Sequence, residues 1–166
     1  MKIQRKQSVV LVPLPFQGHL TPMLQLGSIL HSQGFSVIIA HPEFNTPKYS
    51  NHPEFVFHSM DDGLKGINIS LPSLENIYDL NENCKVPLRN YLVKKMKEEG
   101  DQLACIVYDN VMIFVDDVAT QLRLPSIVLH TSSAAYLHSM ITIFQQPEKY
   151  FPFEGMRTNT SSASRF

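Results

Sequence analysis

The stretch Val9-Val-Leu-Val-Pro-Leu-Pro-Phe-Gln-Gly-His-Leu-Thr-Pro22 decides how this chain folds. It opens with an apolar, mostly β-branched run, which is typical of strands buried on both faces of a parallel sheet. Near its end, Thr21 predicts a helix N-cap and Pro22 the first helical residue, where the missing N–H of proline costs nothing. His19 is therefore expected in a tight turn between strand and helix, at the sheet edge where open α/β folds bind ligands. A catalytic base is expected at such a position.

The rest of the chain repeats this alternation of buried strands and amphipathic helices. Strands are predicted at 9–14, 35–40, 55–60, 103–108 and 125–129, and helices at 22–33, at 73–99 with a break at Pro87, at 111–122, and from a cap at 131–133 to about 144. The alternation indicates an α/β fold with a Rossmann-like parallel sheet and helices on both faces. Residues 64–72 are expected to be loop, and residues 1–150 one domain. Residues 151–166 are expected to be a disordered tail, because 157–166 have almost no apolar content.

Composition and charge exclude several classes of partner. The 166 residues carry 14 basic and 15 acidic side chains, a net charge of −1, so nothing favours nucleic acid or an anionic membrane surface. The short apolar run near the N-terminus is broken by Pro13 and Pro15 and has no signal-peptide cleavage site. No apolar stretch approaches the roughly 18 residues of a membrane span. We therefore expect a cytoplasmic protein with small-molecule or protein partners.

The two cysteines and the histidines give no metal-binding pattern. Cys105 lies in an apolar run and is expected in the core, whereas Cys84 lies in a polar segment and is expected to be exposed. Two cysteines make neither a disulfide framework nor a zinc cluster, and the histidines other than His19 lack ligand spacing. No metal site is predicted.

His19 and Asp109 are candidates for a catalytic dyad. Asp109 follows the predicted strand 103–108, and in a Rossmann-like order this strand neighbours the first one. The two side chains would then face each other, with the carboxylate fixing the tautomer of a neutral histidine that accepts a proton. The alternative is that His19 only hydrogen-bonds a loop and Asp109 caps the following helix.

Further polar or small residues lie at the same predicted edge. Gly18 and the start of the first helix could hold a phosphate, or Gly18 could be a simple turn residue. Thr131, Ser132 and Ser133 follow the last predicted strand and could donate hydrogen bonds to a sugar or a phosphate. Helix capping explains at least one of them without a ligand.

Several stretches resemble plant family 1 UDP-dependent glycosyltransferases, most closely the branch with steviol and cytokinin glucosyltransferases. The resemblance runs from about Ser8 to Tyr150. It rests on Pro15-Phe-Gln-Gly-His-Leu-Thr-Pro-Met-Leu-Gln-Leu-Gly27, Gly34-Phe-Ser-Val-Ile38, Phe44-Asn-Thr-Pro47, His52-Pro-Glu-Phe55, Asp61-Asp-Gly-Leu64, Cys105-Ile-Val-Tyr-Asp109, Val118-Ala119, Leu124-Pro125 and Thr131-Ser-Ser-Ala134.

The resemblance implies the N-terminal, acceptor-binding half of a GT-B fold, in which two Rossmann-like domains face each other. It implies an inverting transfer of a hexose, with glucose expected, from a UDP-sugar to a hydroxyl of a small lipophilic plant metabolite. His19 would be the general base, Asp109 would hold it, Thr131 would touch the donor sugar and Gly18 would lie near the diphosphate. The UDP-sugar is a co-substrate, and neither a metal nor another cofactor is expected.

The resemblance also has a limit. The family's second domain, whose signature grips the uridine, ribose and diphosphate, has no counterpart in these 166 residues, so we expect a truncated product or fragment with little activity alone. The alternative is a non-catalytic acceptor-binding or regulatory fragment. An unrelated Rossmann-like nucleotide binder would need a Gly-rich phosphate loop, which is missing. The apolar surface that would face the second domain is expected to promote association or instability.

Overall fold

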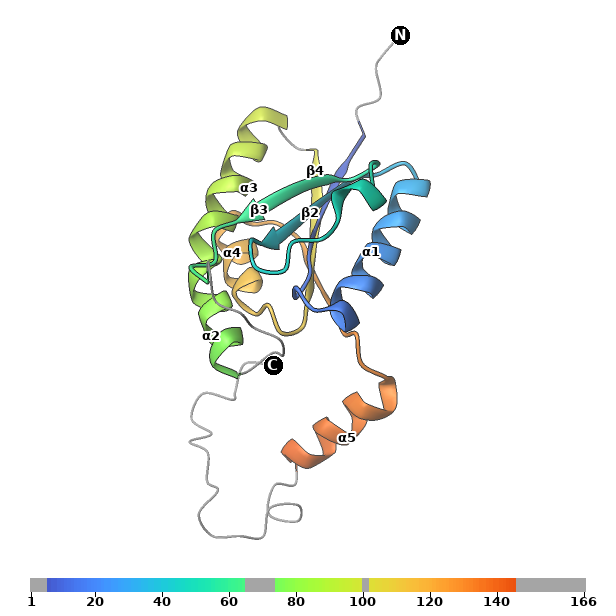
Figure 1. Cartoon of the computed structure of the whole chain (residues 1–166), viewed down its shortest axis with the longest axis vertical. Coiled ribbons are helices and arrows are strands. Elements are labelled where there is room, and N and C mark those ends of the chain that lie inside the picture. Colours follow the sequence, from blue (N-terminus) through green and yellow to red (C-terminus); the bar gives the residue numbers. More distant parts are fainter. Residues whose placement is uncertain (1–5, 65–73, 100–101, 146–166) are drawn as a thin grey trace. The chain divides into compact units, whose positions relative to one another are not determined.

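Five strands form one parallel sheet in the order β3-β2-β1-β4-β5 (Figure 1). The computed structural model describes residues 6–64, 74–99 and 102–145. The strands are β1 (Ser8–Val12), β2 (Ser36–Pro42), β3 (Val56–Met60), β4 (Leu103–Asp109) and β5 (Ser126–Leu129). This order makes β1 and β4 neighbours where the winding of the sheet reverses, which confirms the Rossmann-like arrangement.

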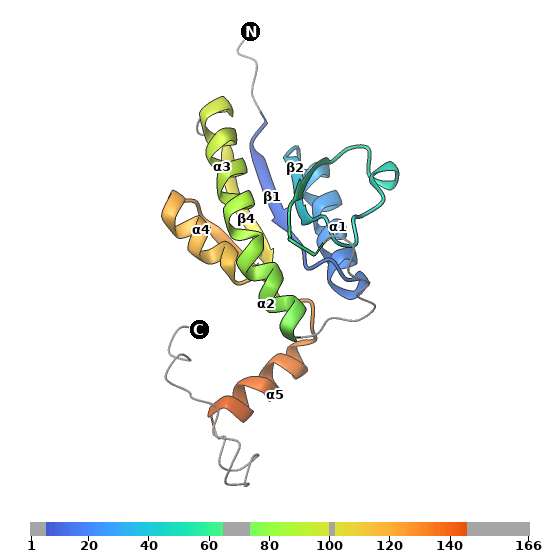
Figure 2. The ribbon, with the colours of Figure 1, turned by 60° about the vertical axis from the view of Figure 1, so that its left-hand side comes forward.

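Helices cover both faces of the sheet (Figure 2). α1 (Gln17–Ser32) lies on one face, whereas α3 (Lys85–Glu99) and α4 (Phe114–Leu122) lie on the other. α2 (Leu74–Asn83) leads directly into α3, and a single 3₁₀ turn, η1 (Tyr49–Asn51), lies between β2 and β3. The predicted α/β class is therefore confirmed.

The alternation of side chains along β1 explains why both faces need a cover. Val9 and Leu11 pack in a cluster with Met23 of α1, whereas Val10 and Val12 pack in a second cluster with side chains of α3 and α4. All five are at most 2% exposed. Because successive strand residues point to opposite faces, an uninterrupted apolar strand requires helices on both sides.

The first helix begins earlier than predicted. It starts at Gln17 rather than Pro22, with Phe16 as N-cap in an extended conformation, and the Leu20 N–H donates to the Phe16 carbonyl at 2.8 Å. Thr21 is therefore not the N-cap, and Pro22 lies inside the helix. Because Pro22 is the sixth residue of the helix, it cannot donate to the Gly18 carbonyl one turn earlier, and its ring crowds that carbonyl. The helix ends at Ser32, one residue before the predicted end, and Gly34 follows with a φ of +94° that favours glycine.

Four other expectations differ from the structure. The break between α2 and α3 falls at Cys84, and Pro87 lies in the first turn of α3, where its missing N–H is not needed. α4 begins at Phe114 rather than Val111. Cys84 was expected at the surface but is fully buried, because the junction of the two helices turns it into the core, whereas Cys105 is only half-buried.

The chain divides into two compact units, Met1–Thr131 and Ser132–Phe166. In the second unit, Ser133 Oγ accepts the Tyr136 N–H at 3.2 Å at the start of α5 (Ala134–Gln145), which confirms the predicted helix and its capping. No helix in the described residues is long and apolar enough to cross a membrane. The predictions for residues 65–72 and 151–166 lie outside the described residues.

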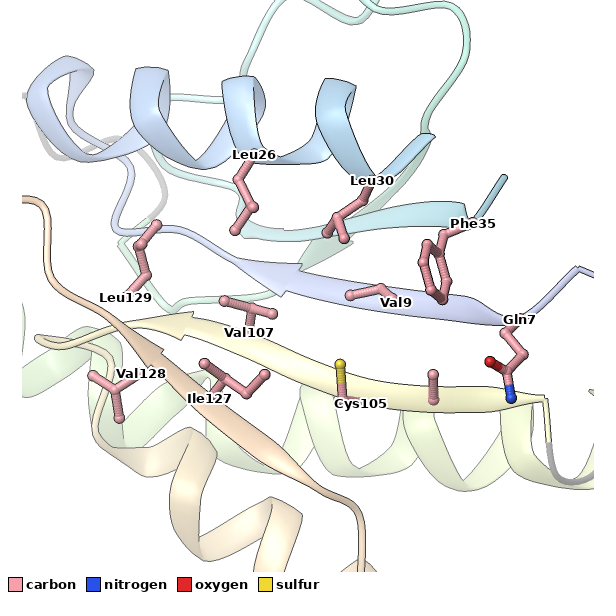
Figure 3. A pocket seen from close by; sticks show the side chains of 11 residues that line it. Gln7, Val9, Leu26, Leu30, Phe35, Cys105, Val107, Ile127, Val128 and Leu129 are labelled. Carbon is pink, nitrogen blue, oxygen red and sulfur yellow. The ribbon is translucent and has the colours of Figure 1, made fainter. Parts of the chain in front are cut away.

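A groove of about 400 Å³ runs along the α1 side of the sheet (Figure 3). Leu26 and Leu30 of α1 lie on one side of it, and the apolar side chains of β4 and β5 lie on the other. Ile127 of the edge strand β5 pairs with Val107, which packs on the α1 face, and Ile127 is 55% exposed. Within the first unit, α1 thus leaves part of the apolar sheet face over β4 and β5 uncovered.

Candidate active site at the carboxyl edge of the sheet

Strand order brings His19 and Asp109 together. Asp109 is the last residue of β4, and His19 lies in the first turn of α1, just after β1. Because β1 and β4 are parallel neighbours, their carboxyl ends meet at one edge, and His19 Nδ1 lies 2.8 Å from Asp109 Oδ2. The earlier start of α1 means that a helical turn, rather than a loop, holds the imidazole.

The Asp109 carboxylate is fully engaged. It is 0% exposed; Oδ2 bonds His19, and Oδ1 accepts the Val111 N–H at 3.0 Å. A carboxylate only accepts hydrogen bonds, which assigns the proton of the neutral imidazole to Nδ1 and the lone pair to Nε2. Among the described residues we find no hydrogen bond to Nε2, so this nitrogen can accept a proton from a ligand.

Asp109 also sets the proton affinity of His19. The hydrogen bond that His19 Nδ1–H donates to Asp109 raises the pKa of His19 above its usual value of 6.5, and the negative charge of the carboxylate adds to this effect. Partial burial opposes the shift, since the imidazole is only 30% exposed. The carboxylate dominates, so the protonated imidazole is stabilised where it would form during general base catalysis.

Thr131 completes this cluster. Its Oγ1 lies 3.0 Å from His19 Nδ1, so the Nδ1–H is shared between the hydroxyl and the Asp109 carboxylate. Sequence reasoning missed this contact. The available signal was the position of Thr131 just after β5, which borders β4 in the sheet. Three neighbouring strands therefore each bring one member of the cluster to the same edge.

The other two predicted site residues, Gly18 and Ser132, lie at exposed positions. Gly18 is exposed in the first turn of α1, its φ is not in the left-handed region, and no atom lies within 4 Å of where a Cβ would be. It is not a turn residue, and the fold does not require glycine there. Ser132 is the exposed first residue of the second unit. In the described part of the chain, no three His, Cys, Asp or Glu side chains are grouped to hold a metal ion.

The fold and the site define a Rossmann-like α/β domain with a carboxylate-held histidine at the carboxyl edge of its sheet. Solved structures with this fold include Phytolacca americana UGT2 complexed with UDP-2fluoro-glucose and pterostilbene, with a TM-score of 0.71, 18% identity and coverage of 92% of this chain and 36% of that one. A UGT transferase from Siraitia grosvenorii in complex with UDP gives a TM-score of 0.58 at 29% identity. The match covers 89% of this chain and 28% of that one. These proteins place the fold among GT-B glycosyltransferases.

Sequence relatives give the family. UDP-glycosyltransferase 76E1 of Solanum lycopersicum is 84% identical over 154 residues, which are 93% of this chain and 32% of the relative. UDP-glycosyltransferase 76G1 of Stevia rebaudiana is 37% identical, and the match covers 88% of this chain and 34% of the relative. No protein-family model matches the chain. The chain belongs to the plant UDP-glycosyltransferases and spans about a third of the length of these relatives.

Proposed function

We propose that this chain supplies the acceptor-side half of an inverting O-glycosyltransferase. The reaction moves a hexose, with glucose expected, from a UDP-sugar to a hydroxyl of a small lipophilic plant metabolite. The observation that carries the proposal is the 2.8 Å contact between His19 Nδ1 and Asp109 Oδ2, which leaves Nε2 as the base. The cytoplasm is the proposed compartment.

The chemistry assigns one task to each member of the dyad. Nε2 of His19 takes the proton of the acceptor hydroxyl while its oxygen attacks the anomeric carbon of the sugar. The bond from that carbon to the diphosphate breaks, UDP leaves, and attack from the opposite side inverts the configuration. Asp109 stabilises the imidazolium that forms, which is the effect expected from the raised pKa of His19.

Donor contacts are proposed for three residues. Gly18 would let the diphosphate approach the first turn of α1, because its position is exposed and no atom of the described chain fills the space beside it. Thr131 would contact the sugar with its own O–H, since its oxygen already accepts at His19 Nδ1. Ser132 would add a further hydroxyl. The resemblance to the family supports these roles, with the UDP-sugar as co-substrate.

The second candidate is a non-catalytic fragment that binds acceptors or a longer partner. The favouring observation is the exposed edge strand β5, where the apolar Ile127 and Val128 are 55% and 46% exposed. The exposed apolar residues of β5 would favour association in this case.

One experiment separates the two candidates. Single-turnover glucosylation of an acceptor panel with UDP-glucose is measured for the chain alone and for the chain mixed with the separately expressed remainder of the tomato relative. A chimera in which this chain replaces the matching segment of that relative serves as the covalent version. Product in the mixture or chimera that disappears in His19→Ala supports the transferase. No product from folded proteins in any format supports the non-catalytic fragment.

A further inference from the structure

Asn81 is a buried amide that connects α2 to the segment after β4. It is 8% exposed, and its side chain bonds three backbone groups. Nδ2 donates to the Ile77 carbonyl of its own helix at 2.8 Å and to the Val111 carbonyl at 3.0 Å, while Oδ1 accepts the Phe114 N–H at 3.1 Å. Both donors and the acceptor are therefore used, which fixes the orientation of the amide.

The Val111 backbone links Asn81 to the dyad. Its carbonyl accepts from Asn81, and its N–H donates to Asp109 Oδ1 at 3.0 Å. The other carboxylate oxygen contacts His19 Nδ1 at 2.8 Å. Three hydrogen bonds in series thus connect the Asn81 amide with the imidazole. The Val111 N–H is therefore one of the two groups that hold the Asp109 carboxylate.

Asn81 also supplies the side-chain cap that the N-terminus of α4 lacks. Ile113, the N-cap residue of α4, has no side-chain cap, and the free N–H of Phe114 is satisfied by Asn81 instead. An amide from another helix therefore fixes where α4 begins. It holds the backbone between Asp109 and Phe114 at two points, Val111 and Phe114.

We propose that Asn81 is a positioning residue for the His19–Asp109 dyad. By holding the turn after β4, it keeps the Asp109 carboxylate on Nδ1 of His19, so that Nδ1 stays protonated and Nε2 stays the base. The catalytic meaning of this inference rests on the proposed function. The structural part of the inference is that Asn81 controls the tautomer and the proton affinity of His19. This part does not depend on the proposed function.

The test is a nitrogen-15 NMR titration of the histidine rings in this chain, with the His19 signals identified by their loss in His19→Gln. We expect Asn81→Ala to lower the proton-binding constant of His19 at least about three-fold, towards its value in Asp109→Asn. It should also raise the fraction of neutral imidazole that carries its proton on Nε2. In an Asp109→Asn background, Asn81→Ala should change neither property further, because it acts through Asp109.

Asn83 provides a matched control on the same helix. Its Nδ2 donates to the Asp62 carbonyl at 2.8 Å, a similar amide-to-backbone bond that leads to a different loop. Asn83→Ala should leave the His19 titration unchanged. If Asn81→Ala does not fold, Asn81→Asp decides, since its carboxylate still accepts the Phe114 N–H but, when ionised, cannot donate to Val111. A wild-type tautomer ratio in folded Asn81→Ala, or in Asn81→Asp at alkaline pH, would overturn the proposal.

The outcomes for the two proposals are separable, because the titration needs no catalytic turnover. A chimera without transferase activity but with an Asn81-dependent His19 tautomer would reject the proposed function and keep the positioning role. An active chimera in which Asn81→Ala leaves the His19 tautomer unchanged would reject the positioning role and keep the proposed function.

Discussion

His19 and Asp109, 90 residues apart in the sequence, form a 2.8 Å hydrogen bond between Nδ1 and Oδ2. The contact depends on the pairing of β1 with β4, which aligns the carboxyl ends of two strands that are not consecutive in the chain. Since the carboxylate is fully buried and the imidazole is partly exposed, the pair is shielded on the Asp109 side and open on the other.

Replacing Asp109 by asparagine should lower the pKa of His19 and allow the other tautomer, because an amide brings neither the charge nor an acceptor-only group. We expect a fall in kcat of the chimera of about 10³- to 10⁴-fold, as is typical when a catalytic histidine loses its carboxylate. Asp117→Asn, an exposed carboxylate of α4 that pairs with Lys85, is the control and should change neither property. An unaltered His19 titration in Asp109→Asn would contradict the assignment.

The pH dependence of transfer should follow His19. A histidine that serves as a general base acts in its neutral form, so the proposed role predicts a rate that rises with pH through the raised pKa of His19 and levels off above it. Asp109→Asn should shift this acidic limb to lower pH while lowering the plateau. The measurement is kcat/KM of the chimera against pH. If the acidic limb of the kcat/KM profile lies at the same pH in Asp109→Asn as in the wild type, a group other than His19 controls this limb.

Two glycines of α1 should respond in opposite ways to a side chain. At Gly27 a Cβ would lie 3.1 Å from Phe55 Cζ and 3.2 Å from Leu11 Cδ1, so Gly27→Val should destabilise the chain by about 1–3 kcal/mol through overpacking. At Gly18 there is open space, so Gly18→Ala should keep or raise stability by up to about 1 kcal/mol. Urea unfolding measures both.

In the chimera, the same Gly18→Ala variant should raise the KM for UDP-glucose, because the methyl group would occupy the space proposed for the diphosphate. Unchanged KM would remove Gly18 from the proposed donor contacts without affecting the dyad.

His41 should make the fold sensitive to acid. It is 0% exposed, its Nδ1–H donates to the Pro42 carbonyl at 2.7 Å, and its Nε2 accepts from the Tyr49 hydroxyl at 3.0 Å. Burial lowers the pKa of His41 below 6.5, so the unfolded chain gains a proton first as pH falls. The contribution of His41 to the free energy of unfolding is therefore complete above pH 6.5 and declines below it, towards the folded pKa of His41.

Urea unfolding between neutral and mildly acidic pH tests this. His41→Phe should flatten the decline, although part should remain because burial also lowers the pKa of His58. Tyr49→Phe keeps the titrating group and should retain the slope. His19 acts in the other window, since its raised pKa adds stability below 6.5 that is lost as pH rises through its folded value. If the free energy of unfolding depends on pH equally in His41→Phe and in the wild type, His41 is not the source of the acid sensitivity.

The two cysteines should differ in reactivity. Burial raises the pKa of Cys84 to about 12, helped by the charges of Asp62 and Asp61, whereas Cys105 is half-buried in the wall of the apolar groove. Since the thiolate is the reactive form, a disulfide reagent should modify Cys105 slowly in the folded chain and Cys84 only after unfolding. Cys105→Ser should leave a folded chain that resists the reagent. Rapid labelling of Cys84 in that variant would show that the α2–α3 junction opens.

The sequence by itself determined the fold class and the family. An apolar strand such as 9–12 needs a helix on each face, and the repetition of such strands leaves a parallel α/β sheet as the solution. The motif around His19 indicated the glycosyltransferase family, and the relatives confirm it. Such patterns can be read locally because they depend on the period of side chains along one element.

Tertiary structure decided the geometry of the site. Propensity placed the start of α1 at Thr21 and Pro22, but the chain begins the helix at Gln17, which moves His19 into a helical turn. The contacts of Thr131 and Asn81 arise from strand order and helix packing across 112 and 30 residues of sequence. The burial of Cys84 likewise follows from how α2 meets α3. These features depend on which distant groups a hydrogen bond or a side chain meets, and no local pattern in the sequence encodes that.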